Sequence, residues 1–249
     1  MMRIRRFGSL LRAVLALQLF ALVPTGQAAA SDALLRRYDA AVAYAKRERV
    51  ESEVFRNLTA ITPDNRKLRW RTVDSRRQVL CVTWTDKVYY PGAVMTLPRD
   101  KVVWVTVVPE LRSFFRKHGS NGMNPTLRAE QLLGLPPDFK LNRFVEFWAF
   151  PEDLIRPSPD PEITDHEAEI RFRPASRFTS SNASYRKWFG RAAAMSYEGK
   201  RQFPWTRLGY TYDWSADGHH IGLSEFVVLG GAKIQVASVF SNEDYLRGR

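Results

Sequence analysis

The residues best suited to chemistry lie close together between positions 205 and 226. In the stretch GHHIGLSEF, Glu225 opens an apolar run and follows two adjacent histidines, His219 and His220. A carboxylate at a loop–strand junction is suited to act as a general base, and a histidine to carry protons near neutral pH. We therefore expect Glu225 and His220 to be catalytic, with Asp213 orienting the histidine.

Aromatic and cationic residues interleave with these groups and predict a ligand-binding cleft. Polar reactive side chains among aromatic rings are typical of such clefts. We expect substrate contacts from Tyr212, Arg207 and Trp214, and a fourth from Arg71, which lies in the basic stretch RKLRWR. The expected substrate is small and polar or anionic.

A purely structural interpretation of the same stretch is also open. Asp217 and Gly218 are suited to form a turn, and Glu225 to pair with an arginine. On either interpretation residues 224–229 and 233–240 are expected to be paired strands about Gly230-Gly231. On the structural one, the histidines are exposed and only mark the entry to that hairpin.

The common catalytic and cofactor motifs are absent from the sequence. It contains no G-x-S-x-G, no P-loop, no G-x-G-x-x-G and no H-E-x-x-H. Asp165, His166 and Glu169 offer metal-ligand atoms, but we expect a solvated acidic loop there and no metal site. Cys81 lies in the apolar run VLCVTWT, where a thiol is usually inert. The cofactor, if there is one, stays unknown.

One weak resemblance involves Glu225. An arginine-bearing strand (Arg69, Arg71), then RFTSS at residues 177–181, then Glu225 before an apolar run resembles the order of elements in the ADP-ribosyltransferase family. In that family the glutamate positions the nicotinamide ribose, which is the role the resemblance implies for Glu225. The sequence departs from the pattern at Leu223, where a second glutamate is expected. We keep this transferase activity as a minor alternative.

The first thirty residues have the organisation of a secretory signal peptide. Arginines at positions 3, 5 and 6 precede an apolar core over residues 10–23, and small residues follow at Ala28-Ala29-Ala30. We expect cleavage near Ala30 and a periplasmic or secreted mature protein without a transmembrane segment. The alternative is an uncleaved N-terminal anchor.

The chain is basic, with 38 Lys+Arg against 26 Asp+Glu and a net charge of +12. Removal of the signal, with its four arginines, leaves +8. A positive field favours anionic partners such as an anionic small molecule, a glycan or an acidic protein. Nucleic acid is not expected, because the basic stretch lacks repeated aromatic platforms. The single cysteine excludes an internal disulfide.

Periodicity and turn residues predict one α+β domain over residues 31–249, with a mainly antiparallel, twisted sheet and flanking helices. A Pro-rich surface loop is expected at 151–162. Helices are expected at 31–50, 110–118, 126–133, 182–197 and from 242. Strands are expected at 67–73, 78–85, 93–97, 102–108, 143–150, 168–172, in LGYTYDW, and at the two hairpin segments named above.

The sequence therefore favours an exported basic enzyme with a cleft near residues 205–226. The principal alternative is a non-catalytic periplasmic or secreted binding or inhibitor protein. An enzyme requires Glu225, a histidine and a third polar group to converge in a concave pocket. A protein-binding module instead presents a flat patch of exposed aromatics and arginines.

Overall fold

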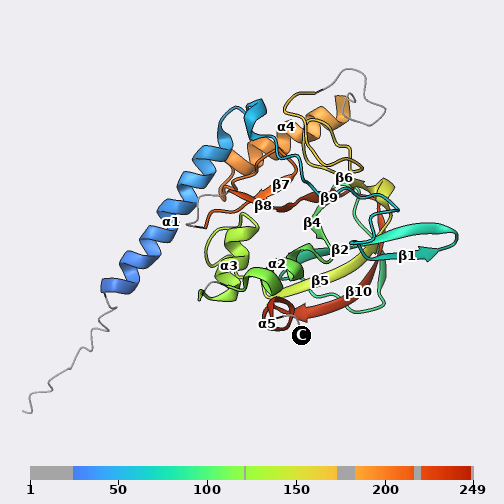
Figure 1. Ribbon diagram of the computed structural model, residues 1–249, viewed down its shortest axis with the longest axis horizontal. Coiled ribbons are helices and arrows are strands. Elements are labelled where there is room, and N and C mark those ends of the chain that lie inside the picture. Colours follow the sequence, from blue (N-terminus) through green and yellow to red (C-terminus); the bar gives the residue numbers. More distant parts are fainter. Residues whose placement is uncertain (1–24, 121, 173–182, 216–219, 248–249) are drawn as a thin grey trace, which may run out of the picture.

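The computed structural model describes residues 25–120, 122–172, 183–215 and 220–247 (Figure 1). In this part of the chain a large antiparallel sheet of eight strands is flanked by α-helices, with a two-stranded sheet beside it. The predicted α+β class is confirmed. Predicted residues His219 and Asp217-Gly218 lie outside the described residues.

The helices lie at the outside of the sheet (Figure 1). They are α1 (Thr25–Lys46), α2 (Glu110–His118), α3 (Pro125–Leu132), α4 (Ala183–Glu198) and α5 (Asn242–Leu246), with short 3-10 helices η1 (Glu51–Glu53) and η2 (Pro151–Asp153). No described helix is long and apolar enough to cross a membrane.

The large sheet has the strand order β3-β10-β5-β2-β4-β9-β6, with β1 paired to β2. Its strands are β1 (Trp70–Val73), β2 (Arg76–Thr85), β3 (Val94–Thr96), β4 (Val103–Val107), β5 (Arg143–Ala149), β6 (Leu154–Ile155), β9 (Phe226–Val228) and β10 (Lys233–Ser241). Strands β7 (Tyr210–Tyr212) and β8 (Ile221–Ser224) form the small sheet.

The large sheet curls around an apolar core. Alternate residues of its strands point to one face, as the period of two requires, and there they form a single buried cluster that includes Cys81 and Phe147. Strands β3 and β6 are the first and the last in the strand order. Met95 of β3 and Leu154 of β6 nevertheless contact the same cluster. The two ends of the sheet therefore face each other across this core.

The outer face of the sheet is covered by helices at two places. Leu80 and Phe144 pack with residues of α2, α3 and α5. Val227, on β9, packs with Ala45 of α1 and with Phe189 of α4. This second contact brings the C-terminal end of α1 against the segment that leads into β7.

The predicted pairing of the last two long strands is wrong. Strand β9 pairs with β4 and β6, whereas β10 pairs with β3 and β5. The glycine pair does form a turn, closed by the Ala232 amide donating to the carbonyl of Leu229 at 3.2 Å, but the strands beyond the turn pair with other strands. The residues before β4 pack closely against this turn: a Cβ on Gly230 would lie 2.4 Å from the carbonyl oxygen of Arg99, and the Gly231 amide donates to the carbonyl of Leu97.

Two other segments differ from expectation. Residues 154–161 are buried, so the prediction of a Pro-rich surface loop at 151–162 is wrong. The fully buried Arg156 lies in this segment. No strand forms at 168–172, where the chain borders an open cavity and has no strand partner.

Helix α1 also departs from its predicted bounds of 31–50, because it begins at Thr25 and ends at Lys46. Its N-terminal part projects from the body of the molecule (Figure 1). Among the residues of α1 whose exposure is described, the buried ones (Tyr38, Ala41, Val42 and Ala45) all follow position 30.

Candidate functional site

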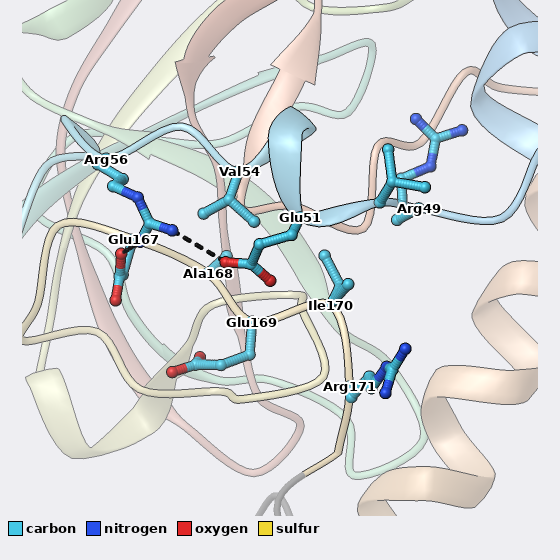
Figure 2. Close-up of a pocket in the computed structure, with 10 residues that line it drawn as sticks. Arg49, Glu51, Val54, Arg56, Glu167, Ala168, Glu169, Ile170 and Arg171 are labelled. Atoms are coloured by element: carbon cyan, nitrogen blue, oxygen red, sulfur yellow. Dashed lines mark hydrogen bonds and ion pairs between the residues drawn. The ribbon is translucent and has the colours of Figure 1, made fainter.

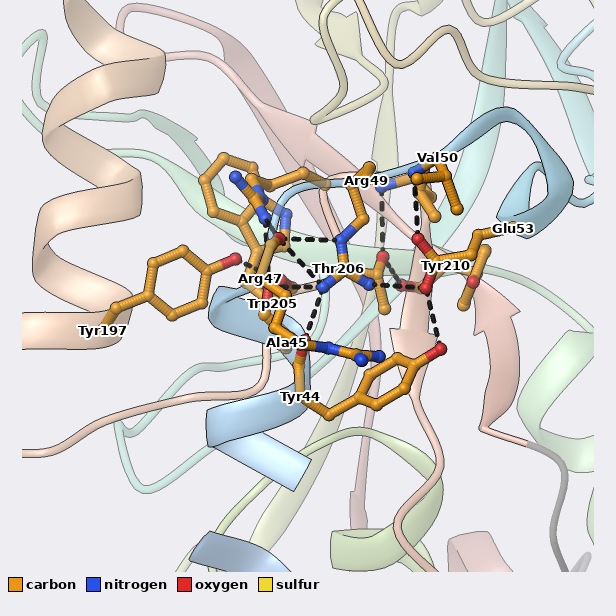
Figure 3. A network of polar contacts seen from close by, with 12 residues as sticks. Tyr44, Ala45, Arg47, Arg49, Val50, Glu53, Tyr197, Trp205, Thr206 and Tyr210 are labelled. Atoms are coloured by element: carbon orange, nitrogen blue, oxygen red, sulfur yellow. Dashed lines mark hydrogen bonds and ion pairs between the residues drawn. The ribbon is translucent and has the colours of Figure 1, made fainter. Parts of the chain in front are cut away.

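The C-terminal end of α1 organises the candidate site (Figure 3). The Nη2 atom of Arg49 donates to the carbonyls of Tyr44 at 2.6 Å and Ala45 at 3.0 Å. The same atom of Arg207 donates to Ala45 at 3.1 Å and to Arg47. Cations are favourable at a helix C-terminus, where carbonyls lack helical partners. The predicted ligand contact Arg207 is thus fixed beside α1.

A second set of contacts holds Arg49 itself. The Tyr44 hydroxyl donates to Oε1 of Glu53 at 2.7 Å, and Nη1 of Arg49 lies 3.4 Å from the same oxygen (Figure 3). The Val50 amide donates to Oε2 at 3.0 Å. Burial acts to raise the pKa of Glu53, but the hydrogen bonds from Tyr44 and Val50 and the charge of Arg49 outweigh it, so the pKa is lowered. The ionised carboxylate fixes the turn after α1.

Glu225 lies between β8 and β9, and its amide donates to the carbonyl of Gly209 at 2.9 Å. Within the described part of the chain, its buried Oε2 atom has no hydrogen-bond partner. Burial raises the pKa of Glu225 to about 8. Burial raises the pKa of the Tyr197 phenol, the nearby charge of Arg207 lowers it, and Glu225 also acts to raise it. Glu225 therefore belongs to the same region as Arg207.

A cleft opens where the chain after α1 faces residues 167–172 (Figure 2). It consists of two adjoining cavities of about 520 and 400 Å³ that share Arg49, Val50, Ile170 and Arg171. The larger cavity is the one drawn in Figure 2. The smaller one reaches Arg207. We call the two together the α1 cleft.

The two cavities of the α1 cleft differ in charge. In the larger one, Arg56 forms ion pairs with Glu51 and Glu167, which neutralise it. The smaller one has Glu48 as its single acidic lining residue. Its other lining residues are cationic or apolar: Arg49, Arg171, Arg207, Val50, Pro159, Ile170, Phe172 and Phe189. This end of the cleft suits a ligand with an anionic group and an apolar part.

Asp213 lies elsewhere, in a buried ion pair. Its two carboxylate oxygens accept from Nη1 of Arg128 at 3.0 Å and from Nη2 at 2.6 Å. Both side chains are under a tenth exposed. The contact between Asp213 and His220 runs through the backbone, with the Asp213 amide donating to the His220 carbonyl at 3.0 Å. The carboxylate of Asp213 is therefore held in a buried pair with Arg128.

The predicted Trp214 contact is also structural. The indole is buried, and its Nε1 atom donates to the carbonyl of Leu135 at 2.9 Å. Its ring packs edge-on against Tyr38 of α1 with the centroids 5.6 Å apart. A buried tryptophan with its N–H paired is a packing element. Trp214 therefore helps to fix α1 and does not line the cleft.

His220 and Tyr212 form an aromatic cluster next to the candidate site. The two rings stack with centroids 5.3 Å apart, and Tyr44 contacts both, at 5.2 Å from His220 and 5.8 Å from Tyr212. Tyr44 thus connects this cluster to Glu53 and Arg49. Neither His220 nor Tyr212 is among the residues that line the α1 cleft.

Arg71 lies on β1, on the opposite side of the molecule from β7 and β8 (Figure 1). Its guanidinium donates to the side chains of Gln78 and Gln235, both at 2.7 Å, and stacks over Trp148. The structure therefore does not bring Arg71 to Glu225. The resemblance to ADP-ribosyltransferases included Arg71, which the structure places away from Glu225. Residues 177–181, which also belong to that resemblance, lie outside the described residues.

Asp165 and His166 have structural partners. Asp165 pairs with the buried Arg156 at 2.7 Å, and Nδ1 of His166 lies 2.7 Å from the carbonyl of Leu58. In the described segments, no group of three or more histidines, cysteines or acids is placed to hold a metal ion.

Sequence reasoning missed the residues that form the cleft walls. Arg49 was expected inside a helix, and Arg171 and Phe172 in a strand. The signal available was the run KRERV directly after the helix, because clustered cations near a helix C-terminus often bind its free carbonyls. Comparison of the chain with protein-family models, curated proteins and solved structures gives no significant match.

Proposed function

We propose that the protein binds a small ligand with an anionic group and an apolar body, in the part of the α1 cleft next to Arg171 and Arg207. The observation that carries the proposal is the smaller cavity, which Arg171 and Arg207 line with Glu48 as the single acid, while its third arginine, Arg49, is paired with Glu53. Phe172 and Phe189 provide the apolar surface. Guanidinium groups suit carboxylates and phosphates because their N–H donors form a planar fork.

Binding without catalysis fits the geometry better than an enzyme. An acid–base mechanism needs its groups within hydrogen-bond reach of one reacting centre. Asp213 is held by Arg128, and His220 is stacked on Tyr212. The catalytic alternative then rests on Glu225. Its raised pKa suits a general acid near neutral pH, but the residue does not line either cavity.

The proposal includes export of the mature chain, as the N-terminal sequence predicts. Cleavage near Ala30 would shorten α1 by its first turn and a half, because the helix begins at Thr25. All buried residues of α1 whose exposure is described would remain in the mature protein. Intact-mass measurement of the exported protein tests this; a mass that retains residues 1–30 contradicts cleavage.

Titration calorimetry with octyl phosphate tests the binding proposal, with octanol and inorganic phosphate as separate probes. We expect octyl phosphate to bind more tightly than either fragment. Arg171→Gln should weaken binding by about tenfold or more, because a hydrogen bond to a charged group is worth about 1.5–3 kcal/mol. Arg171 is exposed and in no ion pair among the described residues, so this variant should fold.

A matched control is Arg143→Gln, which removes one charge at the start of β5, outside the α1 cleft. It should bind octyl phosphate like the unmodified protein. Equal binding of octanol and octyl phosphate, or full binding by Arg171→Gln, would overturn the proposed recognition of the anion.

A further inference from the structure

A second surface lies at the other end of the molecule, where the outer face of the large sheet has no helix on it. Residues directly opposite each other on paired strands share a face. The register Val94↔Gln235↔Trp148 and Thr96↔Lys233 therefore places these residues on one face. The helices α2, α3 and α5 cover this face around Leu80 and Phe144, whereas Val94 is 55% exposed.

The β1–β2 hairpin extends this face with arginines stacked on aromatic rings. Arg71 lies over Trp148 with its Cζ atom 4.9 Å from the ring centroid, and Arg76 lies over Phe150 at 3.9 Å. Figure 1 shows the hairpin projecting from the sheet. We call the surface formed by residues 66–76, β3, the start of β10 and the loops on either side of β3 the basic face.

The basic face carries much of the positive charge of the protein. Residues 66–101 contain nine lysines and arginines and three aspartates, so this segment has half of the net charge of +12. Lys233 adds another cation opposite Thr96. The exposed cations of this surface and its loops are Arg66, Lys67, Arg69, Arg76, Lys87, Arg99, Lys101 and Lys233. Arg77 is also exposed but stacks on Trp70, on the other face of the hairpin.

Apolar side chains protrude among these cations. Six large hydrophobic residues are exposed in the described part of the chain, and three of them, Val88, Tyr90 and Val94, lie in or next to β3. Tyr90 is 71% exposed and Val88 61%. Tyrosine is enriched where proteins meet the headgroup region of a bilayer, and cations there are attracted to anionic lipids.

We propose that the basic face binds the surface of a membrane that contains anionic lipids, with Val88, Tyr90 and Val94 entering the headgroup layer. The distribution of charge favours this partner. The cations are spread over a hairpin and several loops, and an anionic bilayer offers negative charge over a similarly wide area. Single-stranded nucleic acid is less suitable, because Arg71 and Arg76 already cover the rings of Trp148 and Phe150.

Vesicle co-sedimentation of the mature protein tests the proposal. The probes are vesicles of phosphatidylcholine alone and of phosphatidylcholine with three-tenths phosphatidylglycerol. We expect binding to the anionic vesicles only, decreasing as salt rises. The variant Lys87→Gln/Arg99→Gln/Lys101→Gln/Lys233→Gln should lower the partition coefficient by at least about a hundredfold, and Tyr90→Ser/Val94→Ser should lower it less.

The matched control removes four exposed cations elsewhere, as Arg36→Gln/Arg37→Gln/Lys187→Gln/Arg191→Gln on α1 and α4. It should retain most of the vesicle binding. An equal loss in the control would show a general charge effect and overturn the assignment of this face. Equal binding to neutral vesicles would also overturn the proposal. Complete displacement by millimolar inositol hexaphosphate, together with unchanged binding of the Tyr90→Ser/Val94→Ser variant, would indicate a soluble polyanion instead.

Discussion

The arginines around α1 and α3 and those on the basic face differ in burial more than in the kind of partner, since Arg49, Arg128 and Arg207 also lie over aromatic rings. Around α1 and α3, Arg49 and Arg207 bind backbone carbonyls, and Arg128 binds a buried carboxylate. Arg156 is fully buried between Asp165 and the carbonyl of Thr59. On the basic face, the guanidiniums of Arg71 and Arg76 lie over aromatic rings and also bind side-chain acceptors, but the Arg76 side chain is more than half exposed.

This difference shows that the burial of an arginine, more than the kind of group it contacts, decides what the side chain does. A guanidinium removed from water needs acceptors for its donors, and removing either member of a buried pair leaves the other uncompensated. A guanidinium that stacks on a ring at the surface keeps part of its hydration, so its attraction to the ring is modest. The first group should therefore matter for folding, and the second for association.

The buried pair of Asp213 and Arg128 should give the largest effect on stability. We expect Asp213→Asn to lower the free energy of unfolding by about 3–5 kcal/mol, because Arg128 then keeps an unpaired buried charge. Urea denaturation measures the change. The control Glu243→Gln removes an exposed partner of Arg247 and should change stability by less than about 1 kcal/mol. A stable Asp213→Asn protein that has lost ligand binding would restore the role first predicted for Asp213.

The pH dependence of stability should report Glu225. Burial raises its pKa from 4.5 to about 8, so between these values the unfolded state is ionised while the folded state holds the proton. Stability should then fall as pH rises from about 5 to 8, by up to about 1.4 kcal/mol per pH unit. Burial also raises the pKa of Glu110, to about 7. Glu110 should therefore add to the fall in stability as pH rises to about 7.

Glu225→Gln should flatten this dependence and stabilise the protein at pH 8 relative to the unmodified chain. Chemical denaturation of both proteins at several pH values measures it, and Glu110→Gln separates the second contribution. An unchanged slope in Glu225→Gln would show that its carboxyl is hydrated or paired in solution. A loss of activity toward any substrate, with stability retained, would instead favour the catalytic alternative.

Arg207→Gln should have a moderate, local effect. It removes donors to the carbonyls of Ala45 and Arg47, and a hydrogen bond from a charged group is worth about 1.5–3 kcal/mol. We expect faster amide hydrogen exchange confined to the last turn of α1, together with weaker octyl phosphate binding. Faster exchange throughout the chain would mean that Arg207 supports the whole fold.

Arg76→Ala should give the smallest change in stability. The side chain is exposed, and its ion pair with Glu152 is on the surface, so we expect less than about 1 kcal/mol in urea denaturation. The same substitution should reduce vesicle binding. A loss above about 2 kcal/mol would show that the arginines of the basic face are as structural as those around α1 and α3, and the contrast between the two regions would not hold.

Local sequence patterns predicted most of the elements of the fold. Helix α2 occupies the predicted residues 110–118, and strands β2, β4 and β5 lie within two residues of their predicted ends. Strand β4 is internal, as its apolar run indicated, because β2 and β9 pair with it. Such runs are informative since burial on both faces demands apolar residues at every position.

Long-range pairing was not predictable in the same way. The glycine pair at 230–231 forms a turn, as its composition indicates, yet the strands on either side of it pair with β4, β6, β3 and β5, which come from much earlier in the chain. The candidate site has the same difficulty. Arg207 falls in the predicted window, but the other residues that line the cleft come from 48–56 and 167–172 and from Pro159 and Phe189. No local pattern connects those segments.

The buried segment at 154–161 has a consequence for backbone hydrogen bonding. Irregular backbone is rarely buried because each amide N–H needs an acceptor. Prolines at positions 157, 159 and 161 remove every second donor here. The amides of Arg156 and Ser158 donate to the carbonyls of Pro161 and Arg156, and the Tyr185 hydroxyl donates to the Ser158 carbonyl. An alternating proline pattern can thus mark chain that is able to enter a protein interior without forming a helix or a strand.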